Sequence, residues 1–162
     1  MATVRDLALY LIPRAMDHKT TVSLPRLIKL MYLADWRESF LNNSQITDVK
    51  WKFGSCGPSS EEIYAQLRKD VSAFVISEVM DRFGNPKTMV GKATFDCEGS
   101  LSDAQRLSAD FILAIAKNRP WESLSALVSA TYPIATREPG VELNLPALAE
   151  EYRRDVLPLL KK

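Results

Sequence analysis

The stretch LIKLMYLADW, residues 27–36, places an aspartate in a segment that otherwise predicts a buried helix. Ser23 can cap this helix, and Pro25 suits its first turn, where a missing N–H leaves no hydrogen bond unmade. At about 100° per residue, four apolar residues share one face: Leu24, Leu27, Ile28 and Met31. Three cations gather on the opposite side: Arg26, Lys29 and Arg37. Asp35 falls among the apolar residues, where a carboxylate is costly unless it is paired or hydrogen-bonded.

Two interpretations of Asp35 follow from this position. In one, its carboxylate contacts a ligand or a partner. In the other, it is a buried structural group that accepts hydrogen bonds from backbone N–H groups or from a nearby cation. The structural interpretation is favoured, because buried polar groups are nearly always satisfied internally. Lys50, Lys52 or the loop GSCGP at residues 54–58 could supply the partner, so Asp35 is predicted to pin its helix to the loop that follows the strand.

Composition indicates an ordinary globular protein of one domain, residues 1–162. Apolar residues make up 46%, charged residues 25%, and the formal net charge is +1. Such a balance lacks the basic excess of a dedicated nucleic-acid binder, so a nucleic-acid partner is not expected. No uncharged apolar run reaches the length of a membrane span, and no secretory leader is recognisable. We therefore expect a cytoplasmic protein whose two cysteines, Cys56 and Cys97, are reduced thiols.

Motifs of most familiar enzyme classes are absent from the sequence. His18 is the only histidine, and no ligand spacing around it supports a metal site or a nucleophile pair. None of the six glycines builds a phosphate-binding loop. We therefore expect no cofactor, no metal and no catalytic residue. An enzyme centred on Asp35 and Cys56 remains as an alternative, which requires an open pocket with a perturbed carboxylate or thiolate.

Periodicity along the chain predicts a mainly α (α+β) fold, a compact bundle of about six helices with a small antiparallel β element. Helices are expected at residues 4–16, where Pro13 can end the helix early, at 24–41, and after the capping boxes Ser59–Glu62 and Ser102–Gln105. Two more are expected from Trp121 and over residues 145–157. Residues 73–79 and 88–94 predict a hairpin, which a strand at 49–53 could join.

Two further expectations concern local structure. The helix after Ser102 carries a stripe at helical spacing that is predicted to face the core: Ala104, Leu107, Phe111 and Ile115. The segments GSCGPSS, residues 54–60, and TYPIATREPG, residues 131–140, are rich in glycine, proline or serine and are predicted to be loops.

Three patterns occur in a characteristic order: KLMYLADW at residues 29–36, WKFGSCGPSSEEIYAQL at 51–67, and LSDAQRLSADFIL with PWESLSALVSATYP at 101–133. Together they resemble the Panacea domain family, also called SocA-like, a set of small bacterial and phage proteins. The resemblance covers roughly residues 24–152, and the order and spacing of the patterns carry it. Ser55 and Cys56, between Gly54 and Gly57, are the main local departure from the family pattern.

The resemblance implies a function without catalysis. Panacea domains look like antitoxins of toxin–antitoxin pairs, which bind and neutralise a cognate protein toxin that is usually encoded next to them. One branch resembles proteolytic adaptors, which deliver the bound toxin to an AAA+ protease. Either activity requires a protein-binding surface. The expected partners are therefore a toxin and, for an adaptor, a protease.

Six residues are predicted to contact the partner: Tyr32, Trp36, Lys52, Phe53, Pro58 and Tyr64. Trp is enriched at binding hot spots, although core packing is the favoured explanation of Trp36, Trp51 and Phe53. Lys50 and Lys52 beside Trp51 resemble a nucleic-acid surface, but two lysines are more simply a solvated strand face. Cys56 near a helix N-terminus is either a reactive thiol or, more simply, an ordinary loop cysteine.

Overall fold

The computed structural model describes residues 1–94 and 98–161 and has the mainly helical α+β architecture that the sequence predicts. Its α-helices are α1 (Val4–Leu11), α2 (Leu24–Asn42), α3 (Glu61–Lys69), α4 (Asp103–Ala116), α5 (Trp121–Ser129), α6 (Tyr132–Thr136), α7 (Leu145–Asp155) and α8 (Leu157–Leu160). A 3-10 turn, η1 (Ile12–Arg14), follows α1. The strands are β1 (Thr21–Ser23), β2 (Trp51–Gly54), β3 (Gly57–Ser59), β4 (Phe74–Met80), β5 (Pro86–Lys92) and β6 (Glu142–Leu143).

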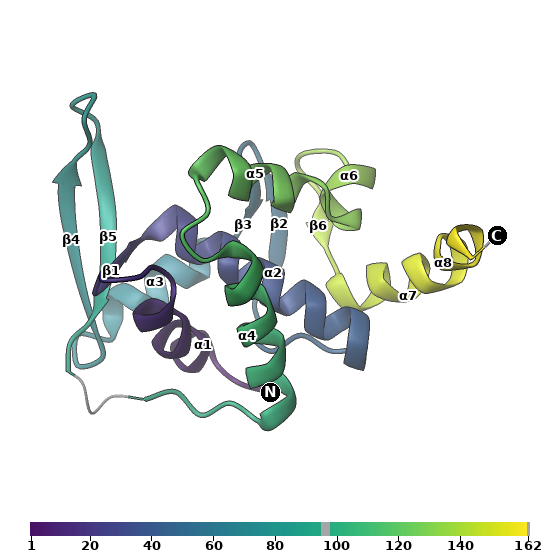
Figure 1. The fold of residues 1–162 in the computed structure, drawn as a ribbon, viewed down its shortest axis with the longest axis horizontal. Coiled ribbons are helices and arrows are strands. Elements are labelled where there is room, and N and C mark those ends of the chain that lie inside the picture. Colours follow the sequence, from purple (N-terminus) through teal and green to yellow (C-terminus); the bar gives the residue numbers. More distant parts are fainter. Residues whose placement is uncertain (95–97, 162) are drawn as a thin grey trace.

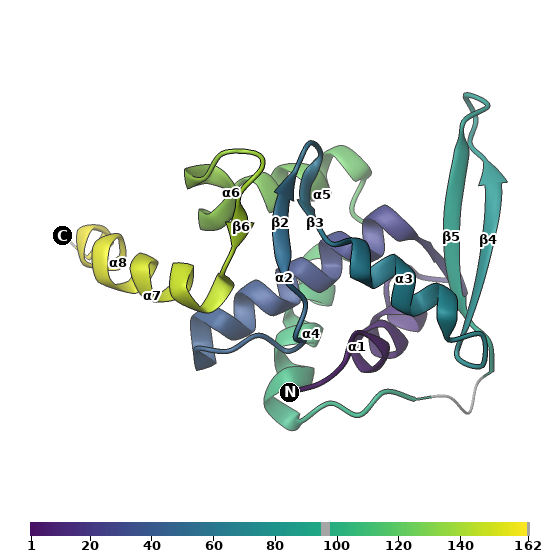
Figure 2. The ribbon, with the colours of Figure 1, turned by 180° about the vertical axis from the view of Figure 1, so that it is seen from behind.

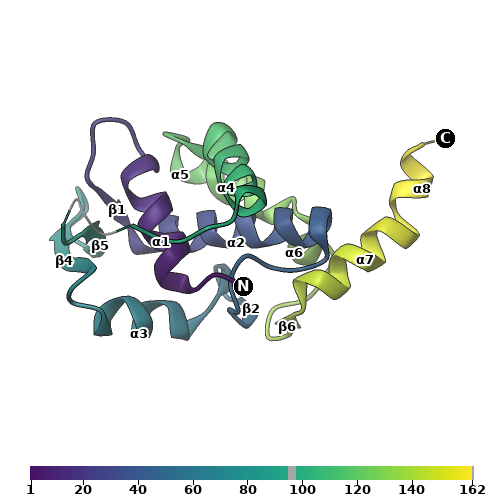
Figure 3. The same cartoon turned by 90° about the horizontal axis from the view of Figure 1, so that it is seen from below.

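Helix α2 is the central element of the molecule. It lies between α4 and α5 on one side and α3 and β2 on the other (Figure 3). Helix α7 packs against its C-terminal end. Because helices pack on several sides of it, residues all round α2 are buried, and they include Arg26 and Lys29 at 9% and 6% exposure. These two cations lie opposite the apolar face, as the helical wheel indicates, but that side of the central helix is covered as well.

Two small antiparallel sheets lie apart from each other (Figure 1). In one, β5 pairs with both β1 and β4, and the β4–β5 hairpin projects from one end of the molecule (Figure 2). In the other, β2 pairs with both β3 and β6. The hairpin was predicted correctly, but β2 does not join it. Strand β2 instead belongs to the second sheet, where Trp51 pairs with Leu143 of β6.

Several predicted boundaries differ from the structure. Helix α1 ends at Leu11 instead of residue 16, because Pro13 converts the chain to a 3-10 turn. The GSCGPSS segment contains β3, and TYPIATREPG contains α6, although both were predicted as loops. Neither β1 nor β6 was predicted, since each has at most three residues and forms only against distant strands.

The two predicted capping boxes have different outcomes. Ser102 accepts a hydrogen bond from the N–H of Gln105 and Gln105 reciprocates, as predicted for the start of α4. At α3 the N-cap is Ser60, whose side chain makes no capping bond. The carboxylate of Glu62 accepts instead from the N–H of Lys50 at 2.9 Å, so it tethers α3 to the segment before β2.

The core face of α4 is not the predicted stripe. Leu107 and Phe111 are 67% and 47% exposed, and Ala104 is exposed as well, whereas Ile115 packs against the core. The buried face instead carries Ser108, Ala109, Ile112, Leu113 and Ala116. With this face toward the core, Leu107 and Phe111 lie on the outer side of the helix.

Candidate functional site

Asp35 is the centre of a buried hydrogen-bond network between α2 and the segment before β2. Its Oδ1 accepts from the N–H of Thr47 at 3.0 Å. Its Oδ2 accepts from Thr47 Oγ1 at 2.6 Å, from Trp51 Nε1 at 2.9 Å and from Gln45 Nε2 at 3.4 Å. The carboxylate is fully enclosed. These donors agree with the structural interpretation of Asp35.

The predicted partner of Asp35 was wrong in one respect. Neither Lys50 nor Lys52 forms an ion pair with it, since both side chains are exposed on the strand face. The donors come from residues 45–47, before the strand, and from Trp51 within it, whereas the predicted loop follows the strand. A neutral network satisfies the carboxylate here, because several short donors replace its hydration without a second buried charge.

Burial is the larger of two opposing influences on the pKa of Asp35. Desolvation disfavours the charged form, and the donations from Thr47 and Trp51 favour it. The result is a pKa raised to about 6. Asp35 is therefore ionised at neutral pH, and it holds the proton more readily than an exposed aspartate.

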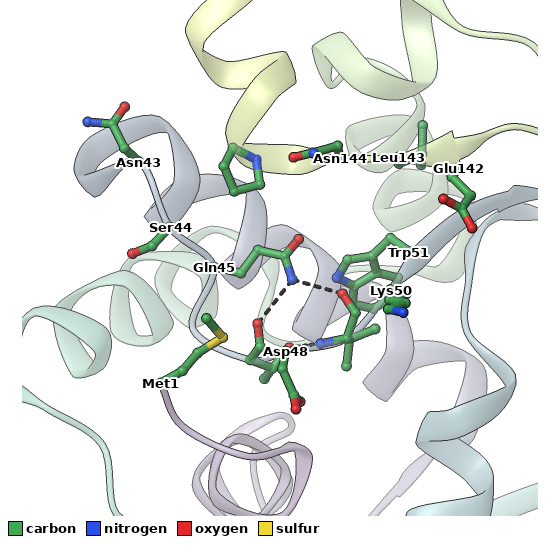
Figure 4. A pocket seen from close by; sticks show the side chains of 13 residues that line it. Met1, Asn43, Ser44, Gln45, Asp48, Lys50, Trp51, Glu142, Leu143 and Asn144 are labelled. Atoms are coloured by element: carbon green, nitrogen blue, oxygen red, sulfur yellow. Dashed lines mark hydrogen bonds between the residues drawn. The ribbon is translucent and has the colours of Figure 1, made fainter.

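A surface pocket of about 550 Å³ lies over this network. Gln45 lines this pocket, and its Nε2 is the same atom that donates to Asp35. This Nε2 also donates to the carbonyls of Thr47 and Val49 (Figure 4). Trp51, Glu142 and Asn144 come from the second sheet and from the N-terminus of α7 to complete the rim (Figure 4). The lining includes Gln45, Thr47 and Trp51, which donate to Asp35, but not Asp35 itself.

Two of the six predicted contact residues are inside the protein. Tyr32 is fully buried, its ring packs edge-on against Trp51 at 5.5 Å, and its hydroxyl shares a hydrogen bond with Thr131 at 2.8 Å. Pro58 is buried on β3, opposite Phe53. The prediction that the Tyr32 side chain reaches a partner was wrong, since neighbouring elements cover it. Pro58 stays a prediction, because it lines a surface cavity beside the β2–β3 turn.

The other four predicted contacts remain open as predictions. Trp36 and Phe53 are half-buried and pack against the core. Lys52 is exposed on β2, and Tyr64 is half-buried on α3. These residues come from α2, β2 and α3, and no pocket that we find brings them together among the described residues.

A surface that was not predicted lies on the outer face of α4. Leu107 and Phe111, one helical turn apart, are both exposed, and the guanidinium of Arg37 on α2 lies 4.1 Å from the centre of the Phe111 ring. Arg37 Nη1 also donates to Ser108 Oγ at 3.2 Å, and Ser108 in turn donates to Glu38 at 2.6 Å. We call Arg37, Leu107 and Phe111 the α4 surface. Its signal in the sequence was the pair of large apolar residues, which were assigned to the core.

The two residues of the enzyme alternative are separated in the structure. Asp35 is enclosed beneath Gln45, whereas Cys56 is a free, exposed thiol in the turn between β2 and β3. Cys97 lies outside the described residues. Within residues 1–94 and 98–161 no group of three or more His, Cys, Asp or Glu side chains is placed to hold a metal ion. No helix in this described part is long and apolar enough to cross a membrane.

Comparisons with protein-family models, with curated proteins and with solved structures find no match for this chain.

Proposed function

We propose that the protein is a cytoplasmic antitoxin that binds a cognate protein toxin directly and blocks its action. Two features support this proposal. The three sequence patterns resemble those of Panacea domains in order and spacing. The α4 surface, in addition, combines two exposed apolar side chains of the 14-residue helix α4 with the half-buried Arg37 of α2.

The α4 surface is the observation that carries the proposal. Arginine and aromatic residues are enriched among binding hot spots, and a hot spot works best on a rigid support. Arg37 is held in place by Ser108 and by the Phe111 ring, so little side-chain freedom would be lost on binding. Exposed apolar side chains that gather on one face mark interaction sites more often than scattered ones do. We infer that a toxin covers this face of α4.

A growth assay tests the proposal. The reading frame next to this gene is expressed alone in a bacterial host, and then together with the intact protein. We expect growth arrest from the neighbour alone, relief by the intact protein, and co-purification of the two chains. A frame-shifted copy of the antitoxin gene is the control and gives no relief. A harmless neighbour, or arrest that the intact protein does not relieve, would contradict the proposal.

A proteolytic adaptor is the second candidate function, and the β4–β5 hairpin is the observation that favours it. An adaptor needs a second face for the protease. The hairpin projects from the end of the molecule opposite α8 (Figure 2), and Val79, Met80 and Phe83 near its tip are 44%, 66% and 74% exposed. Strand β4 is also an edge of its sheet, which is a surface that proteins usually protect unless they use it.

The half-life of the toxin separates the two functions. In an adaptor, Met80→Ser with Phe83→Ser would leave toxin binding intact and lengthen the half-life of the toxin in cells that contain the protease. In a simple antitoxin, the toxin is equally stable in cells with and without the protease. Unchanged degradation in the double variant would reject the hairpin as the protease-binding face.

A further inference from the structure

A second cavity, of about 320 Å³, lies at the N-terminal half of α2. Its walls are apolar on the helix side, from Leu24, Pro25 and Ile28, and the ring of Trp121 closes another side. The β2–β3 turn, residues 54–59, forms the rim. The cavity is separate from the pocket over Asp35 and from the α4 surface, since it shares no lining residue with either.

Lys29 supplies the only charge in the lining of this cavity. Its residue is 6% exposed, and its Nζ donates to the carbonyl of Cys56 at 3.2 Å and lies 5.2 Å from the centre of the Trp121 ring. An ammonium group has three N–H donors, so one carbonyl does not satisfy it. No carboxylate of the described residues lies within 4.0 Å of Nζ.

A buried cation without an anionic partner is costly to the folded protein. Desolvation lowers the pKa of Lys29, which shows that the surrounding protein does not compensate the charge fully. Gly57 has a φ of +105°, and a Cβ at that position would lie 3.4 Å from Nζ. The positive φ favours glycine here, and the turn passes within van der Waals reach of the ammonium group, whose lysine lines the cavity.

We propose that this cavity is a binding site for an amphipathic monocarboxylate, with its carboxylate on Lys29 and its apolar part against Leu24, Ile28 and Trp121. One buried cation matches a single negative charge, whereas phosphate groups are usually held by several donors or an arginine cluster. The apolar walls favour an acid with an apolar body. The volume is at the lower end of ligand pockets and fits a small aromatic acid or a single acidic residue of a polypeptide.

The test uses benzoate and its neutral isostere benzamide, which differ in charge and little in shape. Each is titrated into the ¹⁵N-labelled full-length protein at neutral pH, and the signals of the Trp121 indole and the Gly57 amide are followed by NMR. Benzoate is expected to shift both signals and to bind about tenfold or more tightly than benzamide, because a charge-assisted hydrogen bond is lost in the amide.

Three variants identify the cation. Lys29→Met keeps a side chain of similar length without charge and is expected to weaken benzoate binding about tenfold, whereas Lys29→Arg restores the charge. Lys69→Met removes an exposed lysine of α3 outside the cavity and is the matched control. Since Lys29→Met removes an unpaired buried charge, we expect it to fold. If it does not, Lys29→Gln, which keeps hydrogen-bond donors without the charge, carries the test.

Each of three results would overturn the proposal. One is equal binding of benzoate and benzamide, which would reduce the site to an apolar hollow. Another is benzoate binding that Lys69→Met weakens as much as Lys29→Met does. The third is the absence of any saturable shift at the two signals.

The source of the carboxylate is resolved by a pair of blocked tripeptides, acetyl-Ala-Glu-Ala-amide and acetyl-Ala-Gln-Ala-amide. A Lys29-dependent preference for the glutamate peptide that exceeds the affinity for benzoate would assign the site to an acidic residue of a polypeptide. A preference for benzoate would assign it to a free acid. Either result supports the site, and neither depends on the antitoxin proposal.

Discussion

Two opposing influences act on the pKa of Asp35: burial raises it, and four donated hydrogen bonds lower it. Burial is the larger influence. This balance makes it a structural carboxylate with an unusual titration. Asp35 also links α2 to residues 45–51, and this link depends on the hydrogen bonds that Thr47 and Trp51 donate to its carboxylate.

Stability is expected to depend on pH through Asp35. Its pKa is about 6 in the folded protein and 3.8 when unperturbed, so between these values the folded state holds a proton that the unfolded chain has released. The free energy of unfolding therefore falls as pH rises from about 4 to about 6, by about 3 kcal/mol for the full shift. Above this window the contribution of Asp35 is constant.

Urea unfolding of the wild type and of Asp35→Asn measures this dependence. The amide does not titrate, so the difference between the two proteins isolates the carboxylate from Asp6 and Asp70, whose lowered pKa values act at more acidic pH. We expect the free energy of the wild type relative to the variant to fall across the window. A constant difference between pH 4 and pH 7 would reject the raised pKa.

Thr47→Val tests the donor side of the same network. The substitution keeps the shape but removes the hydroxyl that donates to Asp35 at 2.6 Å and accepts from the N–H of Val49. We expect a loss of about 1–3 kcal/mol in the free energy of unfolding at neutral pH. Thr94→Val, at an exposed position, is the control and should change stability little. Equal effects of the two substitutions would contradict a special role for Thr47.

At the residue scale, the sequence predicted the kind of environment of Asp35 but not its partners. Its place among apolar residues of a helical wheel indicated burial and internal satisfaction. Thr47 and Gln45 carry no pattern that marks them as donors, because their position depends on how residues 43–50 return along α2. Tyr32 was misplaced for a related reason: the wheel shows which face a residue is on but not which faces are covered.

At the scale of the elements, helix starts were predictable where the chain itself forms the cap, as at Ser102. The boundary at α3 was displaced because Glu62 bonds to Lys50, a contact between segments that no local pattern reports. The face of α4 was wrong for the same reason. Packing buries the face of Ser108, Ala109, Ile112 and Leu113, whereas the predicted apolar stripe chose Leu107 and Phe111.

Two serine substitutions compare a working cap with an idle one. Ser102→Ala removes the oxygen that accepts from the N–H of Gln105 and is expected to cost about 1 kcal/mol of unfolding free energy. Ser60→Ala stands at the equivalent position of α3, where the side chain caps nothing, and should cost close to zero. Thermal or urea unfolding of both variants measures the difference. A cost at Ser60 as large as that at Ser102 would contradict the assignment of the caps.

On the scale of the whole molecule, the fold class followed from composition and periodicity, while the arrangement did not. Several helices cover the central α2, and this covering buries Arg26 and Lys29, which the helical wheel alone could not show. The exposed groups are distributed to separate parts of the molecule: the hairpin at one end, α8 at the other, and the α4 surface between them (Figure 1).

Affinity for the toxin, measured by calorimetry on the purified chains, tests the central proposal most directly. Leu107→Ser with Phe111→Ser alters the α4 surface, and Leu159→Ser with Leu160→Ser makes an equally large polar change on α8, where both leucines are exposed. The α4 double variant is expected to bind the toxin about thirtyfold or more weakly, as for the loss of a hot spot, with the melting temperature nearly unchanged. The α8 double variant should bind as the wild type does. Unchanged affinity in the α4 double variant, or equal loss in both, would contradict the assignment of the toxin to this surface.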